Sequence, residues 1–402
     1  MNAKLLIRGL FTFHPSSFRL HPFWLVVMLV LGPPLSVFSQ EAGEYKQAYE
    51  AYQAKDFAAA ERAIDEAIKK DSESRKNFYL KALILASQKK DTEAIQALEK
   101  CTTLKPDDHE ALFMLGSLYL KKKNYEKAVE SLEQGLAYKP GDLKASYRLA
   151  TGYVKLRKYE KAASALSKVE AKGKDQFEYN YLYGVVLRAL GQNDKAIAYC
   201  EQACKLKSDD IPAQLGLADS YQRAGKYKEA MAIIKPVLIN QPGNVEALNT
   251  LGESQLSIRD YQAVISTANK MTVVAAKDYR GYMLRAKAYE ALDQTDKALP
   301  DLKKVYELDN GGGACNAASL LARIYYHRKQ YLEAEGYYQR AYECGKNVTP
   351  LLMLAHCYYK QGSYEKALSA YKKVLKMAPS NEDAQKGVKS SQEYIDRKAQ
   401  GK

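Results

Sequence analysis

Small and apolar residues recur along this chain with a period of 34 residues, from Glu41 to Asn381. In that frame position 8 is always Ala or Gly, and position 20 is Ala in every repeat except one, which has Val264. Positions 4, 7, 8 and 11 share one helical face, and positions 20, 24 and 27 form a second apolar set. Each repeat is therefore predicted to be two closely packed helices joined by a turn. The repeats begin at Glu41, Arg75, His109, Leu143, Phe177, Ile211, Val245, Tyr279, Cys315 and Val348.

A single helical hairpin cannot bury its apolar face, so the ten hairpins must stack into an open array. Segment 382–402 is polar with Ala384, Val388 and Ile395 along one side, and we expect a helix that caps the last repeat. The length of 402 residues alone suggests two or three domains, but the repeats occupy nearly all of the chain after residue 40. The expected fold class is all-α.

This pattern resembles the tetratricopeptide repeat (TPR), and repeat ten (348–381) shows the resemblance best. The residues that carry it there are Leu351, Leu354, Ala355, Tyr358, Gly362, Tyr364, Ala367, Tyr371, Val374 and Pro379. The resemblance implies a right-handed superhelical α-solenoid of about ten helix–turn–helix units. It also implies a non-enzymatic scaffold or adaptor that binds protein or peptide partners in a concave groove.

Residues 1–39 differ from the repeats and have the features of a secretory signal peptide. Segment 1–22 has no acidic residue and three basic ones, Lys4, Arg8 and Arg19. The apolar run at 23–31 is about half of the ~20 residues that span a bilayer, although an uncleaved anchor is the alternative. We expect cleavage near Ser39 and export to the periplasm, the cell envelope or the medium, where the chain assembles an envelope complex. Membrane contact should be peripheral at most.

The resemblance implies that positions 2, 5, 9, 12 and 13 of each first helix line the groove. In repeats one to five, the aromatic residues at these positions are Tyr45, Tyr49, Tyr52, Tyr79, Phe113, Tyr147 and Tyr181. The candidate basic residues are Lys121, Lys155, Arg188 and Arg223 at position 12 or 13 of repeats three to six, with Lys144 of repeat four. Tyrosine offers a large amphipathic contact that loses little rotamer entropy, which suits a peptide ligand. Simple packing is the alternative role for the aromatic set.

Basic residues exceed acidic ones by 14 in the whole chain, and repeat four (143–176) is the most basic repeat. This charge favours an acidic peptide as the partner. The alternative function is binding of an anionic non-protein ligand, such as a cell-wall glycan or an anionic membrane surface. A third interpretation is a merely solvated surface. Nucleic acid fits the charge but not the expected export, so no nucleic-acid partner is expected.

Candidate chemistry is sparse outside the groove. The histidines after residue 39 are His109, His327 and His356, and none has the spacing of a metal ligand set. We therefore expect no catalytic, metal or cofactor site. Cys315 opens the first helix of repeat nine and Cys344 ends its second, and a helical hairpin brings such ends together. They are a candidate disulfide, and two semi-buried thiols are the alternative.

Overall fold

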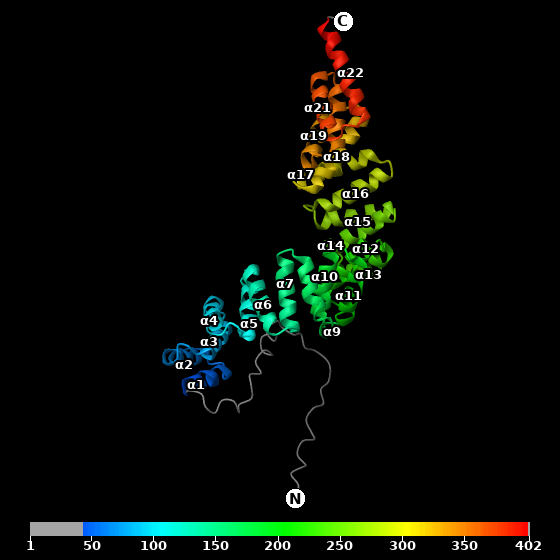
Figure 1. Cartoon of the computed structure of the whole chain (residues 1–402). Helices are drawn as coiled ribbons and strands as arrows, with labels where there is room; N and C mark the ends of the chain where they lie inside the picture. The colour runs from blue at the N-terminus through cyan, green and yellow to red at the C-terminus, as the bar shows by residue number, and fades with distance from the viewer. Residues whose placement is uncertain (1–42, 401–402) are drawn as a thin grey trace. The chain divides into compact units, whose positions relative to one another are not determined.

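A computed structural model of the chain describes residues 43–400, in which every secondary-structure element is an α-helix (Figure 1). The expected all-α fold of stacked helix pairs is confirmed. The expected signal peptide, residues 1–39, lies outside the described residues. The chain divides into two compact bodies between Leu118 and Tyr119, inside α5 (His109–Lys121). The division into ten repeats stays a prediction.

Within residues 43–400, no helix is both long enough and apolar enough to cross a membrane.

The N-terminal body contains two helix pairs ahead of α5. Its helices are α1 (Gly43–Gln53), α2 (Phe57–Lys70), α3 (Arg75–Ser87) and α4 (Asp91–Leu104). Each packs against the next along the chain. Ile64 and Ile84 are completely buried in the cluster that joins α1, α2 and α3, with Ala48 and Ala60 between them. The core of this body is therefore built from one side of each helix.

The C-terminal body is by itself a stack of helices, from α6 to α22 (Figure 1). Its helices are α6 (Tyr125–Tyr138), α7 (Leu143–Lys155), α8 (Tyr159–Ser167), α9 (Glu170–Gly173), α10 (Phe177–Ala189), α11 (Asn193–Leu206), α12 (Ile211–Arg223), α13 (Tyr227–Asn240), α14 (Val245–Ser257), α15 (Tyr261–Val274), α16 (Tyr279–Ala291), α17 (Thr295–Leu308), α18 (Gly312–His327), α19 (Tyr331–Gly345), α20 (Val348–Lys360), α21 (Tyr364–Met377) and α22 (Glu382–Ala399). One buried cluster of this body joins helices α16 to α22.

Each helix pair is closed by a turn with one residue in the left-handed conformation. Glycine fills this place in three turns, at Gly191, Gly225 and Gly362. The other seven turns use a residue with a side chain: Lys55, Lys89, Lys123, Arg157, Arg259, Asp293 and Lys329. A left-handed residue ends a helix because it turns the following N–H groups back toward the last carbonyls. Consistently, the Asp56 N–H donates to the Ala51 carbonyl at 2.9 Å.

Close contact within each pair depends on the small residues at positions 8 and 20, all of which are buried. At two of them even a methyl group lacks space. A Cβ on Gly184 would lie 2.5 Å from the Cys200 sulfur, and a Cβ on Gly252 would lie 2.7 Å from Leu284 Cδ1. Cys200 belongs to α11, so the two helices of the α10–α11 pair are in direct contact. Leu284 belongs to α16, so Gly252 of α14 makes its close contact with the first helix of the next pair.

Repeat four departs from the regular pattern in its second helix. That helix, α8, has 9 residues and is followed by the short α9, whereas α6 and α11 on either side have 14. The Tyr179 side chain is buried beside the break between α8 and α9, where its hydroxyl donates to the Leu166 carbonyl at 3.1 Å. Gly173 lies against the same ring, where an added Cβ would come within 2.4 Å. Tyr179 therefore contacts both helices on either side of the break.

The C-terminal helix α22 covers α21 with a face of small residues, Ala384, Gly387 and Ser391, all buried. An added Cβ on Gly387 would lie 2.5 Å from the Tyr371 ring, so α22 approaches α21 closely. At the outer end of α22, the ring of Tyr394 stacks on that of Tyr364, with centroids 4.5 Å apart.

Replacing Gly184 by alanine should destabilise the fold, because the added methyl overlaps the Cys200 sulfur. We expect a loss of about 1–3 kcal/mol in the free energy of unfolding, measured by urea denaturation followed by circular dichroism. Gly336→Ala is the matched control. Nothing lies within 4 Å of a Cβ there, so better helix propensity should stabilise α19 by up to about 1 kcal/mol. Adding Cys200→Ala to Gly184→Ala should restore stability; if it does not, the contact is not the cause.

Candidate functional site

The predicted groove residues of the N-terminal body lie on α1, α3 and α5. Tyr45 and Tyr49 are half-buried and pack against the cluster around Ile64. Tyr52 is buried, and its ring centroid lies 6.1 Å from that of Phe57, so it packs α1 against α2. Tyrosine 52 is thus mainly a core residue.

Tyr79 and Phe113 are the remaining groove residues of that body, and both are half-buried. Burial and the nearby carboxylates of Glu110 and Asp108 raise the pKa of the Tyr79 hydroxyl. Asp108 is also ion-paired with Arg75 at 2.5 Å. The Phe113 ring makes an edge contact with His109, with centroids 5.9 Å apart.

Tyr147 and Tyr181, here called the tyrosine pair, lie on adjacent first helices of the C-terminal body. They are 34 residues apart, one on α7 and one on α10, and these helices contact each other. Both side chains are half-buried. Burial, with a smaller contribution from Glu178 and the Tyr181 hydroxyl, raises the pKa of Tyr147. The structure therefore brings these two predicted residues together.

An aromatic and charged cluster supports the tyrosine pair. The Phe177 ring stacks on the Tyr181 ring with centroids 5.9 Å apart. The Lys207 ammonium lies 4.1 Å from the centre of the Phe177 ring and 3.0 Å from the Glu178 carboxylate. Phe177 therefore packs against Tyr181 and is itself held by Lys207 at the end of α11. These contacts fix the orientation of the Tyr181 ring.

The predicted basic residues divide into two groups. Lys121, Lys144 and Lys155 are exposed on α5 and α7. Arg188 and Arg223, by contrast, both bind the Asp219 carboxylate, with nitrogen–oxygen distances of 2.9 and 3.0 Å. Arg188 also donates to the Gly216 carbonyl at 2.8 Å. The two arginines are therefore held by α12, and their charge is partly neutralised.

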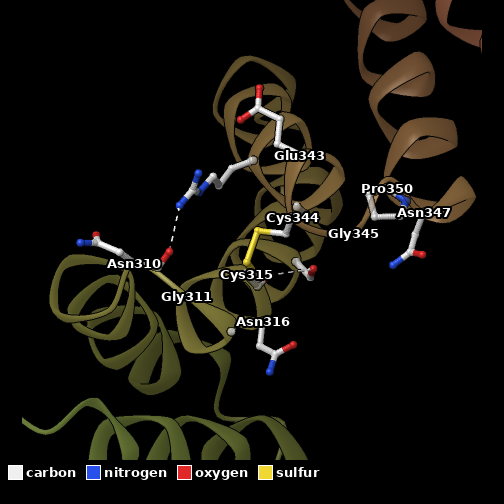
Figure 2. Close-up of a pocket in the computed structure, with 13 residues that line it drawn as sticks. Asn310, Gly311, Cys315, Asn316, Glu343, Cys344, Gly345, Asn347 and Pro350 are labelled. Carbon is white, nitrogen blue, oxygen red and sulfur yellow. Dashed lines mark hydrogen bonds between the residues drawn. A yellow bond between two sulfur atoms is a disulfide. The ribbon is translucent and has the colours of Figure 1, made fainter. Parts of the chain in front are cut away.

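A cavity of about 640 Å³ lies where α18 begins, α19 ends and α20 begins. We call it the disulfide cavity, because Cys315 and Cys344 line it and are joined by a disulfide with Cα atoms 6.0 Å apart (Figure 2). The remaining polar lining consists of Asn310, Asn316, Ser319, Arg340, Glu343 and Asn347. Arg340 reaches across it toward the Asn310 carbonyl at 3.4 Å. Sequence reasoning considered the two cysteines but missed the cavity around them.

A second cavity of about 470 Å³ lies among α6, α7 and the shortened α8. We call it the lysine cavity, because Lys161 of α8 and Lys168, the residue directly after α8, line it together with Ser164. Its inner wall is apolar and includes Leu136, Leu149 and Ala165. Tyr153 also lines it and hydrogen-bonds the Glu133 carboxylate. This site was not foreseen as a cavity, although repeat four stood out as the most basic repeat.

The other described cysteines are free thiols, and Cys101, Cys200 and Cys357 are buried. Burial raises the pKa of Cys101 and of Cys357 to about 12, and that of the half-buried Cys204 to about 11. Within residues 43–400, no three His, Cys, Asp or Glu side chains form a group that could hold a metal ion.

Comparison with protein families matches most of the described chain. Residues 52–265, more than half of the chain, match the model described as Tetratricopeptide repeat protein 21 N-terminal ARM repeat. Residues 279–311 and 313–380 match two further models, each described as Tetratricopeptide repeat.

Curated relatives are distant and longer. DnaJ homolog subfamily C member 3 of Gallus gallus is 26% identical over 233 residues, which cover 51% of this chain and 46% of that protein. Superkiller protein 3 of Schizosaccharomyces pombe is 23% identical over 150 residues, covering 35% of this chain and 11% of that protein. The aligned part of the chain therefore spans less than half the length of these relatives.

Similar solved structures include a tetratricopeptide repeat protein from Parabacteroides merdae. It is 17% identical with a TM-score of 0.46, covering 61% of this chain and 97% of that one. YrrB, a TPR protein with an unusual peptide-binding site, is 21% identical with a TM-score of 0.44, covering 47% and 97%.

The buried thiols should react slowly in the folded protein, because alkylation requires the thiolate and a raised pKa leaves it scarce. With a pKa of about 12, the thiolate of Cys101 or Cys357 at pH 8 is over a hundredfold scarcer than for an ordinary cysteine. Iodoacetamide labelling read by mass spectrometry should therefore modify Cys204 first and the others only in urea. Equal rates for Cys204 and Cys101 in the folded chain would contradict this.

Proposed function

The chain belongs to the tetratricopeptide repeat family, with the ARM-repeat model of tetratricopeptide repeat protein 21 covering more than half of it, and on this premise we propose that it is an exported, non-enzymatic scaffold. It binds a protein or peptide partner along the first helices of the C-terminal body. The partner segment carries acidic residues, and the scaffold serves to assemble a complex in the cell envelope.

The observation that carries this proposal is the tyrosine pair on α7 and α10. Tyr147 and Tyr181 are half-buried side by side, so each ring is oriented by its neighbours yet keeps an accessible part. A pre-oriented tyrosine loses little entropy on binding and offers both an apolar ring and a hydroxyl. Such rings are frequent anchors of protein interfaces.

Charge supports an acidic segment as the ligand. Lys144 and Lys155 are exposed at the two ends of α7, the helix that carries Tyr147. Arg188 and Arg223 share one carboxylate, so that group keeps a net positive charge. Exposed cations near an aromatic anchor attract acidic chains and accelerate their association.

Export rests on residues 1–39, whose basic, apolar and small segments have the order of a signal peptide. The disulfide between Cys315 and Cys344 is compatible with an oxidising compartment. Both observations support a location outside the cytoplasm.

The lysine cavity favours a second candidate function, the binding of an anionic non-protein ligand. Lys161 on α8 and Lys168 directly after it line the cavity, and Ser164 and Tyr153 add hydroxyl groups to its lining. Its volume of about 470 Å³ is within the range of small-molecule sites. An anionic sugar unit or a lipid headgroup has the charge and size for it.

Removing the tyrosine pair should weaken peptide binding. A random peptide library displayed on phage is selected against the full chain, and a selected peptide is titrated by fluorescence anisotropy. Tyr147→Ala with Tyr181→Ala should weaken its affinity about tenfold or more, because both anchoring rings are lost. Tyr138→Ala, at an exposed tyrosine of α6, is the control and should change the affinity by less than about twofold. Unchanged binding by the double variant would contradict the proposed site.

Neutralising the lysine cavity should weaken binding of anionic polymers. Heparin and vesicles containing phosphatidylglycerol are the probes, and Lys161→Gln with Lys168→Gln should reduce affinity about fivefold or more. Lys366→Gln with Lys373→Gln is the matched control. These residues occupy the same repeat positions, and Lys366 lies over the Tyr358 ring at 5.5 Å as Lys161 lies over Tyr153 at 5.7 Å. An equal loss in both variants would show a general charge effect and contradict a site.

A further inference from the structure

The Cys315–Cys344 disulfide is more accessible to solvent than the buried thiols of the chain. Cys344 is exposed at the end of α19, and Cys315 is half-exposed near the start of α18. Both line the disulfide cavity, which is open enough to hold part of another molecule (Figure 2). By contrast, Cys101, Cys200 and Cys357 are buried thiols within the core. The chain therefore places its one described disulfide where an external thiol can reach it.

The helix pair that carries this disulfide has a core of its own. Ala317 and Leu321 on α18, and Ala334 and Tyr338 on α19, are buried in the cluster that also includes residues of α16, α17 and α20. The disulfide lies at the open end of this pair, outside that cluster. Opening the disulfide should leave the packing of α18 against α19 in place.

The lining of the disulfide cavity carries one charge of each sign, so access rather than attraction decides which sulfur reacts. Arg340 contributes a cation to the lining, and Glu343 contributes an anion. Cys344 is the more exposed residue of the pair, so its sulfur is the one that an incoming thiolate reaches first.

We propose that Cys315–Cys344 is an exchangeable disulfide through which the chain forms a mixed disulfide with a cysteine of a bound peptide or protein. The partner's thiolate attacks Sγ of Cys344 and forms the new sulfur–sulfur bond. The Cys315–Cys344 bond breaks, its electron pair goes to Sγ of Cys315, and this thiolate takes a proton from water. One disulfide replaces another, so no external oxidant is required.

Cys315 then acts as the resolving group. Its Cα lies 6.0 Å from that of Cys344, within the range for a disulfide, and the retained α18–α19 packing keeps it there. When its thiolate attacks Sγ of Cys344, the partner leaves as a thiolate and the original disulfide is restored. Covalent capture at this cavity is thus reversible.

The lining suits a short polar peptide segment around the reacting cysteine. Asn310, Asn316 and Asn347 present amide groups around the cavity, and Ser319 adds a hydroxyl. In Figure 2, Asn347 and Pro350 lie on the side of α20, across the cavity from Asn310. Amide and hydroxyl groups bind the backbone of a peptide without demanding a particular charge. The proposal does not depend on the tyrosine pair or on any ligand of it.

The experiment uses two variants of the full chain, each of which keeps only one of the two disulfide cysteines. Cys315→Ser and Cys344→Ser are treated with oxidised glutathione, and the adduct is located by peptide mass spectrometry. Cys315→Ser should form its adduct on Cys344 at least about tenfold faster than Cys344→Ser forms one on Cys315. Cys204, present in both variants, is the internal reference for a half-buried thiol.

The wild-type chain supplies the second readout. Reduced glutathione should open the disulfide of the folded chain without loss of helical circular dichroism, and oxidised glutathione, as the oxidant, should close it again by thiol–disulfide exchange. A ten-residue peptide with a single cysteine is added to separate a peptide partner from a small thiol alone. It should form a mixed disulfide that acid quenching traps on Cys344.

Three results would overturn the proposal. Equal adduct rates in the two variants would contradict the assignment of Cys344 as the sulfur that reacts with the partner. A disulfide that opens only when the chain unfolds would make the bond a structural one. Reaction with glutathione but not with the ten-residue peptide would exclude a peptide or protein as the partner.

Discussion

Direct contact between the two helices of each pair, at positions 8 and 20, is the constraint on which the rest of the structure depends. No side chain at either position is larger than Val264, and every one of them is buried. Helix axes can approach closely only where side chains are small, so larger residues such as Leu302 and Tyr371 fill the space beside that contact. Because these apolar residues face neighbouring helices, the outer surface of the first helices is left to polar and aromatic residues, the tyrosine pair among them.

The all-α fold could be predicted because the same pattern of small and apolar residues recurs in every repeat. A single exception, such as Val264, does not obscure that pattern. The shortened α8 could not be predicted from its own residues, since no proline or glycine stands where it ends at Ser167. The residue that packs against its end is Tyr179, which lies in the next repeat at a position where neighbouring repeats have Ala145 and Ala213. The sequence does contain an indication of the irregularity, because a tyrosine stands where the neighbouring repeats have alanine. It is recognised only when the repeats are aligned with one another.

The sequence could indicate which helices carry the candidate site residues, but not which residues those side chains contact. Position in the repeat indicates which face a side chain occupies, and it placed Tyr147 and Tyr181 on neighbouring helices. It does not indicate that Arg188 and Arg223 share Asp219, because that contact depends on the rotation and spacing of α10 against α12. The pairing of Cys315 with Cys344 needs only the antiparallel course of one hairpin, which the sequence pattern already implies.

Both cavities lie where the repeat pattern is broken. The disulfide cavity borders Gly311 and Gly312, in the stretch where two extra residues interrupt the period, and the lysine cavity borders α8, the short second helix of repeat four. Departures from a local rule concentrate at functional sites, because a generic array needs none of them. The cysteine pair borders one departure and the cavity lysines border the other. Both cavities are therefore candidate sites beside the tyrosine pair, which the regular repeat pattern itself positions.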